Sequence, residues 1–438
     1  MNIMLPMGSY LPNIGGEETY LQSLSTELYR RGHKVTICTM HKKGLPDYES
    51  MDGVDVFRFE SLLQKVPSRE GKPHPPCTDP LVAKSLKIIF DRTKPDVINA
   101  HDWMLFSILS HRKSFNVPLV VTLHNYSHIC PNGLFERNRK TCDSPFAMHC
   151  IGCDNDLYKL SVMKSLVVYA FLKMNRMHLK KVNKFIATHP FQKRIYLQWF
   201  GLNDEDIIVV PNPIDLDKFR RIDVSDEALA LYSKKWGLEM GSNKIVHVGR
   251  LWWDKIEIIT SIINAAPAIV AEFPDTQILI VGGGDCFDYV CKLAERVNRL
   301  LNKKAVVVTG SIANSEIVQI MNLADIVIGV GRVVLEAMSC GKPAIVAGSV
   351  PGPFGGNYSG TLTPDNIVNI SAHNFTGRDS IVRVSSSEVA KDCINLLANK
   401  KYRSYLGRFG REYTEREHDI RKIAQRVESV YFDAIISS

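Results

Sequence analysis

The sequence predicts an α/β protein with two domains, each built on a parallel β-sheet. Short apolar runs rich in β-branched residues alternate with longer stretches of helical period, which is the pattern of parallel strands connected by helices. This pattern occurs in two series, and 438 residues exceed the roughly 100 to 200 residues of one ordinary domain. Hydrophobic residues at 45% and charged residues at 23% are ordinary values for a globular protein.

The first series of strands begins at the start of the chain. Its first strand is followed by a helix over 18–31, which has apolar residues on one face and ends before Gly32, a residue suited to a helix C-cap. The next strand follows at once, so these elements form one βαβ unit. The strands expected in this half are residues 2–5, 34–39, 54–57, 97–100 and 119–123.

The second series begins at Lys244, after a segment that is typical of a linker. Residues 207–219 contain two prolines and two aspartates after a last short strand, so we place the boundary near Asn212. This gives an N-terminal domain over 1–211 and a C-terminal domain over 212–416. The strands expected in this half are residues 245–248, 277–281, 305–309, 326–328 and 344–346.

The tail from Ser386 to Ser438 has helical patterning throughout and no strand signal. We expect its last helix, about 417–438, to pack back on the first domain. Self-similarity of the kind found in solenoid proteins is absent from the sequence.

Composition and charge argue against several classes of function. The longest apolar stretch, 161–174, is broken by Lys164 and is shorter than the roughly 18 to 20 residues that cross a bilayer. The first residues lack the basic region and apolar core of a secretory signal, so we expect a cytoplasmic protein. The 54 basic and 46 acidic residues give a net charge of +8, which indicates only mild attraction to anions. Without a nucleic-acid-binding motif, no nucleic-acid partner is expected.

Two segments that follow predicted strands could bind an anionic ligand. Gly15 and Gly16 precede the first helix, where backbone N–H groups can approach an anion, although an ordinary tight turn explains them too. Arg250 and Lys255 follow the first strand of the second domain, where a fixed guanidinium and a mobile ammonium suit a diphosphate. Two exposed, solvated cations are the alternative interpretation.

A third segment has glycines between a strand and a helix. Residues 329–331 form this loop, and Glu336 lies one turn into the helix, where a carboxylate can accept hydrogen bonds from a ribose diol. The alternative for Glu336 is an ordinary acid on a helix surface. The spacing of the glycines does not match the dinucleotide fingerprint, and no P-loop occurs, so neither NAD nor a P-loop phosphate site is predicted.

In this order and at these separations, the motifs make the chain resemble the retaining glycosyltransferases of the GT-B fold, in glycosyltransferase family 4 (group 1). The resemblance covers essentially the whole chain, and it is specific because of the combination rather than any single motif. Its landmarks are GGEE (15–18), RRGHKVTI (30–37), PDVINAHDW (95–103), PLVVTLHNY (118–126), VVPNPIDLDKF (209–219), VGRLWWDK (248–255), ILIVGGGD (278–285), ADIVIGVGRVVLEAMSCGKPAIVAG (324–348) and GREYTERE (410–417).

The resemblance implies two Rossmann-like domains that hold a nucleotide-sugar donor between them. Arg250 and Lys255 would bind the diphosphate and stabilise its developing charge, so no cofactor would be required for catalysis. His124 would lie beside the reacting sugar as the third catalytic residue; its alternative is a buried, hydrogen-bonded histidine. The turn 310–312 would face the base, and Glu336 the ribose. The donor-binding residues are then Gly15, Gly16, Gly310, Ile312, Gly329, Val330, Gly331, Leu335 and Glu336.

One departure from the family pattern concerns sugar recognition. The family has a pair of glutamates with seven residues between them, and Ile328 stands where the first of the pair belongs. An apolar side chain cannot hydrogen-bond a sugar hydroxyl, so we expect a shifted donor preference rather than lost activity. Ile256 and Pro213 stand where the family has glycines, and both changes look tolerable.

Two further features bear on partners. Cys130, Cys142, Cys150 and Cys153 cluster among the ten cysteines, which is compatible with a structural zinc site, but also with four free or redox-active thiols. The stretch 157–200 has nine Lys or Arg residues and no Asp or Glu. It could rest on anionic lipid at the inner face of the plasma membrane, or guide a phosphate-bearing acceptor; a solvated helix face explains it equally.

The sequence therefore predicts a hexosyltransferase. It would move a hexosyl unit from a nucleotide sugar, most simply UDP-linked, to a hydroxyl of a carbohydrate or lipid-linked acceptor with retention of configuration. A second hypothesis is a nucleotide-sugar 2-epimerase of the same fold, which would release UDP and sugar without an acceptor. A degenerate, non-catalytic sugar-nucleotide-binding protein is a third, motivated by Ile328.

Overall fold

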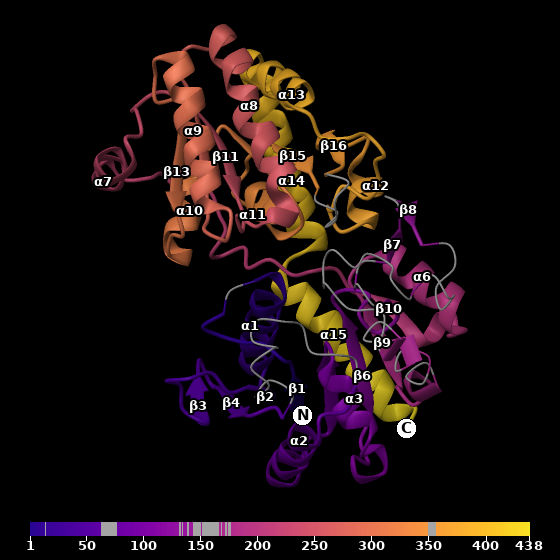
Figure 1. Ribbon diagram of the computed structural model, residues 1–438. Helices are drawn as coiled ribbons and strands as arrows, with labels where there is room; N and C mark the ends of the chain where they lie inside the picture. Colours follow the sequence, from indigo (N-terminus) through magenta and orange to yellow (C-terminus); the bar gives the residue numbers. More distant parts are fainter. Residues whose placement is uncertain are drawn as a thin grey trace. The chain divides into compact units, whose positions relative to one another are not determined.

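The computed structural model describes residues 1–13, 15–62, 77–130, 133, 135–137, 140–142, 150, 166–167, 169–170, 173, 177–348 and 356–438. The chain divides into two compact units (Figure 1). The first unit comprises Met1–Pro213 and Ile420–Ser438, and the second comprises Ile214–Asp419. The sequence places the domain boundary after residue 211, and the structure divides the chain after Pro213. The last helix was expected over about 417–438, and the chain returns to the first unit at Ile420.

The first unit is built on an eight-stranded sheet with the order β10-β9-β6-β5-β1-β2-β4-β3. Its neighbouring strands are parallel except for β3, which pairs antiparallel with β4 at one edge. A separate pair of short antiparallel strands is formed by β7 and β8. The strands are β1 (Asn2–Pro6), β2 (Lys34–Met40), β3 (Tyr48–Met51), β4 (Val54–Phe59), β5 (Val97–His101), β6 (Leu119–Leu123), β7 (Glu136–Arg137), β8 (Lys140–Thr141), β9 (Lys184–Ala187) and β10 (Ile207–Val209).

Alternating side chains of this sheet enter two separate cores. Ile3 and Leu5 of β1 belong to one core, and Met4 between them belongs to the other, as the two-residue period of a strand requires. A sheet buried on both faces needs nearly continuous apolar strands, which explains why β1, β5 and β6 could be predicted. The helices that supply the rest of these cores are α1 (Gly16–Arg30), α2 (Pro80–Thr93), α3 (Met104–Leu109), α6 (Pro190–Phe200) and α15 (Ile420–Ile436); η2 (Arg112–Ser114) and η4 (Asp204–Asp206) are short 3-10 turns.

The C-terminal helix α15 is held in the first unit by buried polar contacts as well as by its apolar face. It contacts α1, β6 and β9. Arg31 donates two hydrogen bonds to the carboxylate of Glu428, at 2.7 and 2.6 Å, and His33 lies 2.6 Å from the same group. Burial opposes the charge of Glu428, but the hydrogen bonds from Arg31 and His33 outweigh it and lower the pKa. Deeper in the unit, the Asn99 amide donates to the Tyr431 hydroxyl at 2.7 Å.

The second unit is built on a six-stranded sheet with the order β13-β12-β11-β14-β15-β16. Pairing is parallel throughout except for β16, which runs antiparallel to β15 at the edge. This and the first sheet confirm the predicted α/β class. The strands are β11 (Asn243–Val248), β12 (Thr276–Val281), β13 (Val306–Gly310), β14 (Ile326–Gly329), β15 (Ala344–Ala347) and β16 (Tyr358–Thr361).

This sheet also separates two cores. Ile245 of β11 and Ile278 of β12 face one core, whereas Val246 and Leu279 face the other. The first core is covered by α8 (Ile256–Glu272), α9 (Phe287–Leu301) and α13 (Ser386–Ala398). The second is covered by α7 (Asp226–Trp236), α10 (Asn314–Leu323), α11 (Arg332–Ser339), α12 (Ile367–Ala372) and α14 (Lys400–Glu417).

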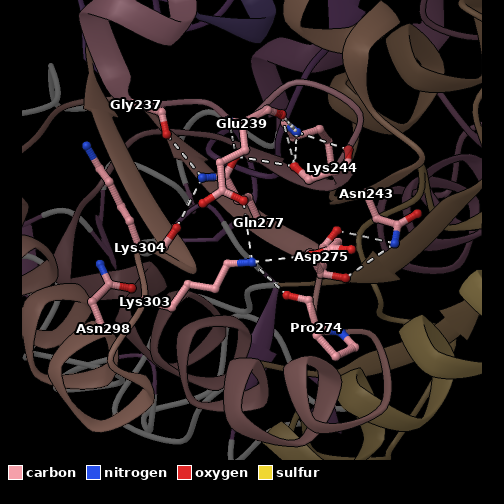
Figure 2. A network of polar contacts seen from close by, with 12 residues as sticks. Gly237, Glu239, Asn243, Lys244, Pro274, Asp275, Gln277, Asn298, Lys303 and Lys304 are labelled. Carbon is pink, nitrogen blue, oxygen red and sulfur yellow. Dashed lines mark hydrogen bonds and ion pairs between the residues drawn. The ribbon is translucent and has the colours of Figure 1, made fainter.

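A network of polar contacts connects the amino ends of β11 and β12 to the neighbouring loops (Figure 2). The fully buried Gln277 accepts a hydrogen bond from Glu239 N–H at 2.8 Å and donates to the carbonyl groups of Gly237 and Lys304, at 3.1 Å each. Lys244 donates to the carbonyl oxygen of Glu239 at 2.7 Å, and burial lowers its pKa. Because the partners are mostly backbone groups of loops, the network fixes these loops to the sheet.

Replacing Gln277 with leucine is expected to destabilise the protein by about 1–3 kcal/mol, because buried backbone N–H and C=O groups lose their partners. Calorimetry of the full chain should show this as a lower melting temperature, by about 2–4 °C for each kcal/mol. Gln425 is exposed on α15, so the matched Gln425→Ala variant should stay within about 0.5 kcal/mol of the original protein. Equal melting temperatures for the two variants would contradict a structural role for the network.

Candidate functional site

The carboxyl ends of four parallel strands lie at one edge of the second unit's sheet. The strands β13, β12, β11 and β14 are neighbours in that order, so the loops that leave them lie side by side. In open α/β sheets, ligands bind outside this edge. Three predicted segments of the site lie at these ends: Arg250 follows β11, Gly310–Ile312 starts with the last residue of β13, and Gly329–Gly331 starts with the last residue of β14.

Backbone contacts hold these loops close together. Gly249 N–H donates to Val281 at 3.0 Å, and Gly282 N–H donates to Gly310 at 3.0 Å. A Cβ atom on Gly282 would lie 1.8 Å from the carbonyl oxygen of Gly249, and φ of Gly282 is +146°. Only glycine therefore fits there. The loop 282–284 was not predicted as part of the site, although three consecutive glycines after a strand are the signal that could have identified it.

Arg250 lies exposed at this edge, with its guanidinium over an aromatic ring. Its Cζ atom lies 4.2 Å from the ring centroid of Trp252, and Trp252 is itself 42% exposed. Such a cation–π contact limits the freedom of the guanidinium without neutralising its charge. In the part of the chain that the structure describes, no carboxylate pairs with Arg250. Lys255 ends the 3-10 helix η5 (Trp253–Lys255), on the loop that follows β11.

Beneath this loop, His247 forms a buried hydrogen bond between two central strands. Its Nδ1 lies 3.0 Å from the carbonyl oxygen of Ile328, which can only accept, so Nδ1 carries the proton. Burial lowers the pKa of His247 to about 4, against the effect of this hydrogen bond. The imidazole is therefore neutral and joins β11 to β14 just below the candidate loops. Sequence reasoning missed His247, because a histidine within an apolar strand gives no distinctive pattern.

The loop after β14 leads into α11 through a glycine. Gly331 has φ +57° and is the N-cap residue of α11, and its N–H donates to Phe375 at 2.8 Å. Glu336, five positions on, is 8% exposed, and Arg332 donates to it at 3.0 Å. The remaining predicted residues of this unit differ in their exposure. Gly329 and Leu335 are buried, whereas Val330, Gly331, Gly310 and Ile312 are partly exposed.

The side chain of Ile328 is fully buried in the core beneath α8 and α9. It lies in β14, one residue before the loop. The departure noted from the sequence is therefore accommodated as an ordinary core residue, and this side chain does not reach the edge where the loops lie.

In the first unit, the loop after β1 is joined to the end of β5. Gly8 N–H donates to the carboxylate of Asp102 at 2.7 Å, and Met104 N–H donates to its other oxygen at 3.0 Å. Burial raises the pKa of Asp102 to about 8, against the effect of these two hydrogen bonds. Gly15 is the N-cap residue of α1 in an extended conformation, and Gly16 begins the helix. Asp102 was not predicted, although an acid that ends a buried strand is a usable signal.

His124 follows β6 and lies against a second histidine. Its Nε2 is 2.8 Å from Nδ1 of His101, and the two rings are stacked with an angle of 17° between their planes. His128 contacts the carbonyl oxygen of Asp102 at 2.9 Å. Burial is the main cause that lowers all three pKa values: to about 3 for His124, to about 4 for His128 and well below the usual value for His101. These imidazoles can exchange hydrogen bonds but carry no charge near neutral pH.

The clustered cysteines are only partly described. Cys130, Cys142 and Cys150 are buried, and the first two belong to the same core; Cys153 lies outside the described residues. Within the described ranges, no group of three or more His, Cys, Asp or Glu residues is placed to hold a metal ion. The structural zinc stays a prediction, which metal analysis of the purified protein would test.

Much of the basic stretch 157–200 also lies outside the described residues, which here include 166–167, 169–170, 173 and 177–200. Its role at a membrane or acceptor therefore stays a prediction. Across the described part of the chain, no helix has the length and apolar character needed to span a membrane.

Comparison with known proteins gives two family matches and several similar chains. Residues 14–218 match the model of Glycosyltransferase Family 4, and residues 230–413 match that of Glycosyl transferases group 1. An uncharacterized glycosyltransferase of Methanocaldococcus jannaschii is 26% identical over 79% of this chain and 80% of its own length. The alpha-monoglucosyldiacylglycerol synthase of Streptococcus pneumoniae is 22% identical over 100% of this chain and 87% of its own.

Among solved structures, the Anabaena protein HepE in complex with UDP-glucose aligns with a TM-score of 0.64 and 19% identity, over 99% of this chain and 100% of its own. At this identity the likeness concerns the fold alone. It confirms the predicted GT-B class for the two sheets described above.

We expect the imidazoles of His124 and His128 to stay neutral from pH 8 down to pH 5. Their 15N signals, assigned from Asn variants, should not titrate in this range, whereas the urea-unfolded chain should titrate near pH 6.5. Because the folded pKa values are about 3 and 4, protons bind the unfolded state first as pH falls. The stability that the neutral forms contribute is then present above pH 6.5 and lost toward pH 4. Midpoints near 6.5 in the folded protein would overturn this assignment.

Proposed function

The chain belongs to the family 4, group 1 glycosyltransferases, and from this premise we propose that it transfers a hexosyl unit from a UDP-linked sugar to a hydroxyl of a carbohydrate or lipid-linked acceptor, with retention of configuration. As a member of this family it is an enzyme of the hexosyltransferase class. The finer statements, on donor, acceptor and stereochemistry, are the proposal.

One observation carries the proposal: an exposed, ordered guanidinium lies at the same sheet edge as three glycine loops. Arg250 is held over Trp252, and Gly282 on the neighbouring loop lies so close to Gly249 that it has no room for a Cβ atom. An anionic diphosphate needs positive charge, which Arg250 supplies at this edge, and room beside the backbone, which residues without a Cβ atom can leave. With Lys255 on the same loop, we propose that transfer needs no metal ion.

The chemistry follows from the charge that develops on the leaving group. The bond between the anomeric carbon and the diphosphate oxygen breaks, and a bond to the acceptor oxygen forms on the same face of the sugar. The acceptor proton passes to an oxygen of the departing phosphate, so no dedicated base is assigned. Arg250 and Lys255 stabilise the growing negative charge by preorganised electrostatics. His124, neutral and held by His101, would hydrogen-bond the reacting sugar without adding charge.

Support for the donor and acceptor comes from the similar proteins. HepE was solved with UDP-glucose, which favours a uridine nucleotide here. The name of the Streptococcus relative indicates a glycolipid product, which favours a lipid-linked acceptor at the inner face of the membrane. In the described part of the basic stretch, Lys180, Lys181 and Arg194 are exposed and available to an anionic surface. The burial of Ile328 in place of a carboxylate leads us to propose an altered donor preference.

The donor is tested by melting the purified protein with UDP, GDP, ADP and dTDP sugars in turn, because a ligand that binds the folded state raises the melting temperature. The stabilising donor is then incubated with candidate acceptors, and NMR of the product reports the anomeric configuration. Inversion would refute the retaining proposal. Release of UDP and a 2-epimerised sugar without an acceptor would indicate the epimerase instead, and binding without turnover the degenerate protein.

Replacing Arg250 with alanine is expected to lower kcat/KM for the donor by about 100-fold, because the diphosphate loses a preorganised charge. Affinity for UDP should fall as well, whereas affinity for uridine, which has no phosphate, should not change. Arg296 is exposed on α9, so Arg296→Ala is the matched control and should keep its activity. If Arg250→Ala stays within a factor of two of the original activity, the assignment is wrong.

A further inference from the structure

Arg332 and Glu336 form an ion pair that is almost completely buried at the start of α11. They are four residues apart, so their side chains lie on the same face of the helix. Arg332 Nε donates to Glu336 Oε1 at 3.0 Å, and the side chains are only 14% and 11% exposed. The same spacing gives the pair Arg411–Glu415 on α14, whose side chains are 28% and 49% exposed. The spacing is common, but the burial of this pair is not.

The position of Glu336 favours a neutral carboxyl, and Arg332 opposes that tendency. Burial raises the pKa of Glu336, while the charge of Arg332, the charge of Lys218 and the hydrogen bond from Arg332 act to lower it. Arg332 remains a cation despite burial, since a guanidinium is not deprotonated in proteins. Removing one member of such a pair leaves the other uncompensated in a poorly solvated place.

The charged groups around this pair balance one another. Asp215, in the segment that begins the second unit, faces Arg332, and Lys218 in the same segment faces Glu336. At the C-cap position that follows α11, the neighbouring titratable group is the thiol of Cys340, whose pKa burial raises to about 12, so it is neutral. Two positive and two negative groups therefore meet here. The Arg332 guanidinium is the member of this group that touches the Glu336 carboxylate.

We propose that Arg332 is a positioning residue: its guanidinium holds Glu336 ionised and in one orientation, so that Oε2 accepts hydrogen bonds from the ribose diol of the donor. This inference rests on the proposed function, which assigns Glu336 to the ribose. Among the residues that the structure describes, no other side chain donates a hydrogen bond to this carboxylate. Arg332 binds one oxygen and leaves the second for the ligand.

The charge state matters because a ribose diol presents two hydroxyl donors. An ionised carboxylate only accepts, and hydrogen bonds to it are stronger than those to a neutral group. A protonated carboxyl offers fewer acceptor sites and adds a donor of its own. Without Arg332, only the charge of Lys218 would counteract the effect of burial on the pKa of Glu336. The preference of the protein for a ribose nucleotide should then depend on pH in a range where the preference of the original protein does not.

The test compares the affinities for UDP and 2′-deoxy-UDP by calorimetry between pH 6 and pH 9. Titration of the phosphate is common to the two ligands and cancels in their ratio. The variants are Arg332→Gln, Arg332→Lys, Glu336→Gln and the control Arg416→Gln, whose side chain pairs with Glu417 and is 63% exposed. Arg332→Lys keeps the positive charge, so it provides the comparison if the Arg332→Gln protein does not fold.

The original protein and Arg416→Gln should prefer UDP at every pH, and Glu336→Gln should lose the preference at every pH. Arg332→Gln should lose about tenfold of the preference at low pH and recover it as pH rises, since one unit of pKa corresponds to a factor of ten. Arg332→Lys should keep most of the preference at pH 7. A purely structural role would lower affinity equally at all pH values and for both ligands.

The inference and the proposed function fail in different ways. If the original protein binds no uridine nucleotide, or if Glu336→Gln keeps the preference for UDP, the assignment of Glu336 in the proposed function is wrong. If Glu336→Gln loses the preference while Arg332→Gln and Arg332→Lys both keep it from pH 6 to pH 9, the role of Arg332 is refuted and the assignment of Glu336 stands.

Discussion

Parallel pairing in the second unit's sheet is the constraint on which the candidate site depends. It brings the ends of β13, β12, β11 and β14 to one edge, so residues far apart in sequence lie side by side there. The loops pack so closely that Gly282 has no room for a Cβ atom beside the carbonyl of Gly249. Arg250, on the loop after β11, places an exposed guanidinium at this edge.

The two units differ in the electrostatics that they offer to a ligand. In the second unit, Arg250 is exposed and charged, and a cation–π contact limits its motion. In the first unit, His101, His124 and His128 are neutral, because burial lowers their pKa values, and their hydrogen-bonding groups serve without net charge. Under the proposed function, this difference would suit a reaction in which charge develops on the leaving diphosphate, while the sugar and acceptor hydroxyls need hydrogen bonds.

Sequence patterns predicted most of the buried parallel strands, although β9 was missed, and they missed features that depend on tertiary context. The strand 119–123 was predicted to the residue, because a strand buried on both faces has five consecutive apolar or β-branched residues. The edge strands YESM and YSGT were missed, since antiparallel edge pairing imposes no such run. In the site, glycines and cations after strands could be located, and the structure brings several of them to one edge.

His101 and His247 could not be assigned in the same way, because a polar residue within an apolar strand does not reveal its partner. The pairing of Arg332 with Glu336 is a sharper case. Its four-residue spacing is visible in the sequence, but Arg411 and Glu415 have the same spacing and lie at the surface. Only the packing of α11 against the sheet, which buries Leu335 and its neighbours, distinguishes the two pairs.

The place of Ile328 limits how this chain can recognise a donor sugar. Its side chain points into the core beneath α8, and its carbonyl oxygen accepts the hydrogen bond of His247, so β14 continues through this position as regular strand. A sugar hydroxyl at the edge cannot reach it. Under the proposed function, hydrogen bonds to the sugar must then come from the loop 329–331 and from side chains of other segments. Peptide groups can donate to a hydroxyl through N–H and accept from it through C=O, but the shape of the loop fixes where these groups lie. Selectivity for the donor sugar therefore depends more on the shape of this glycine loop than it would beside a carboxylate.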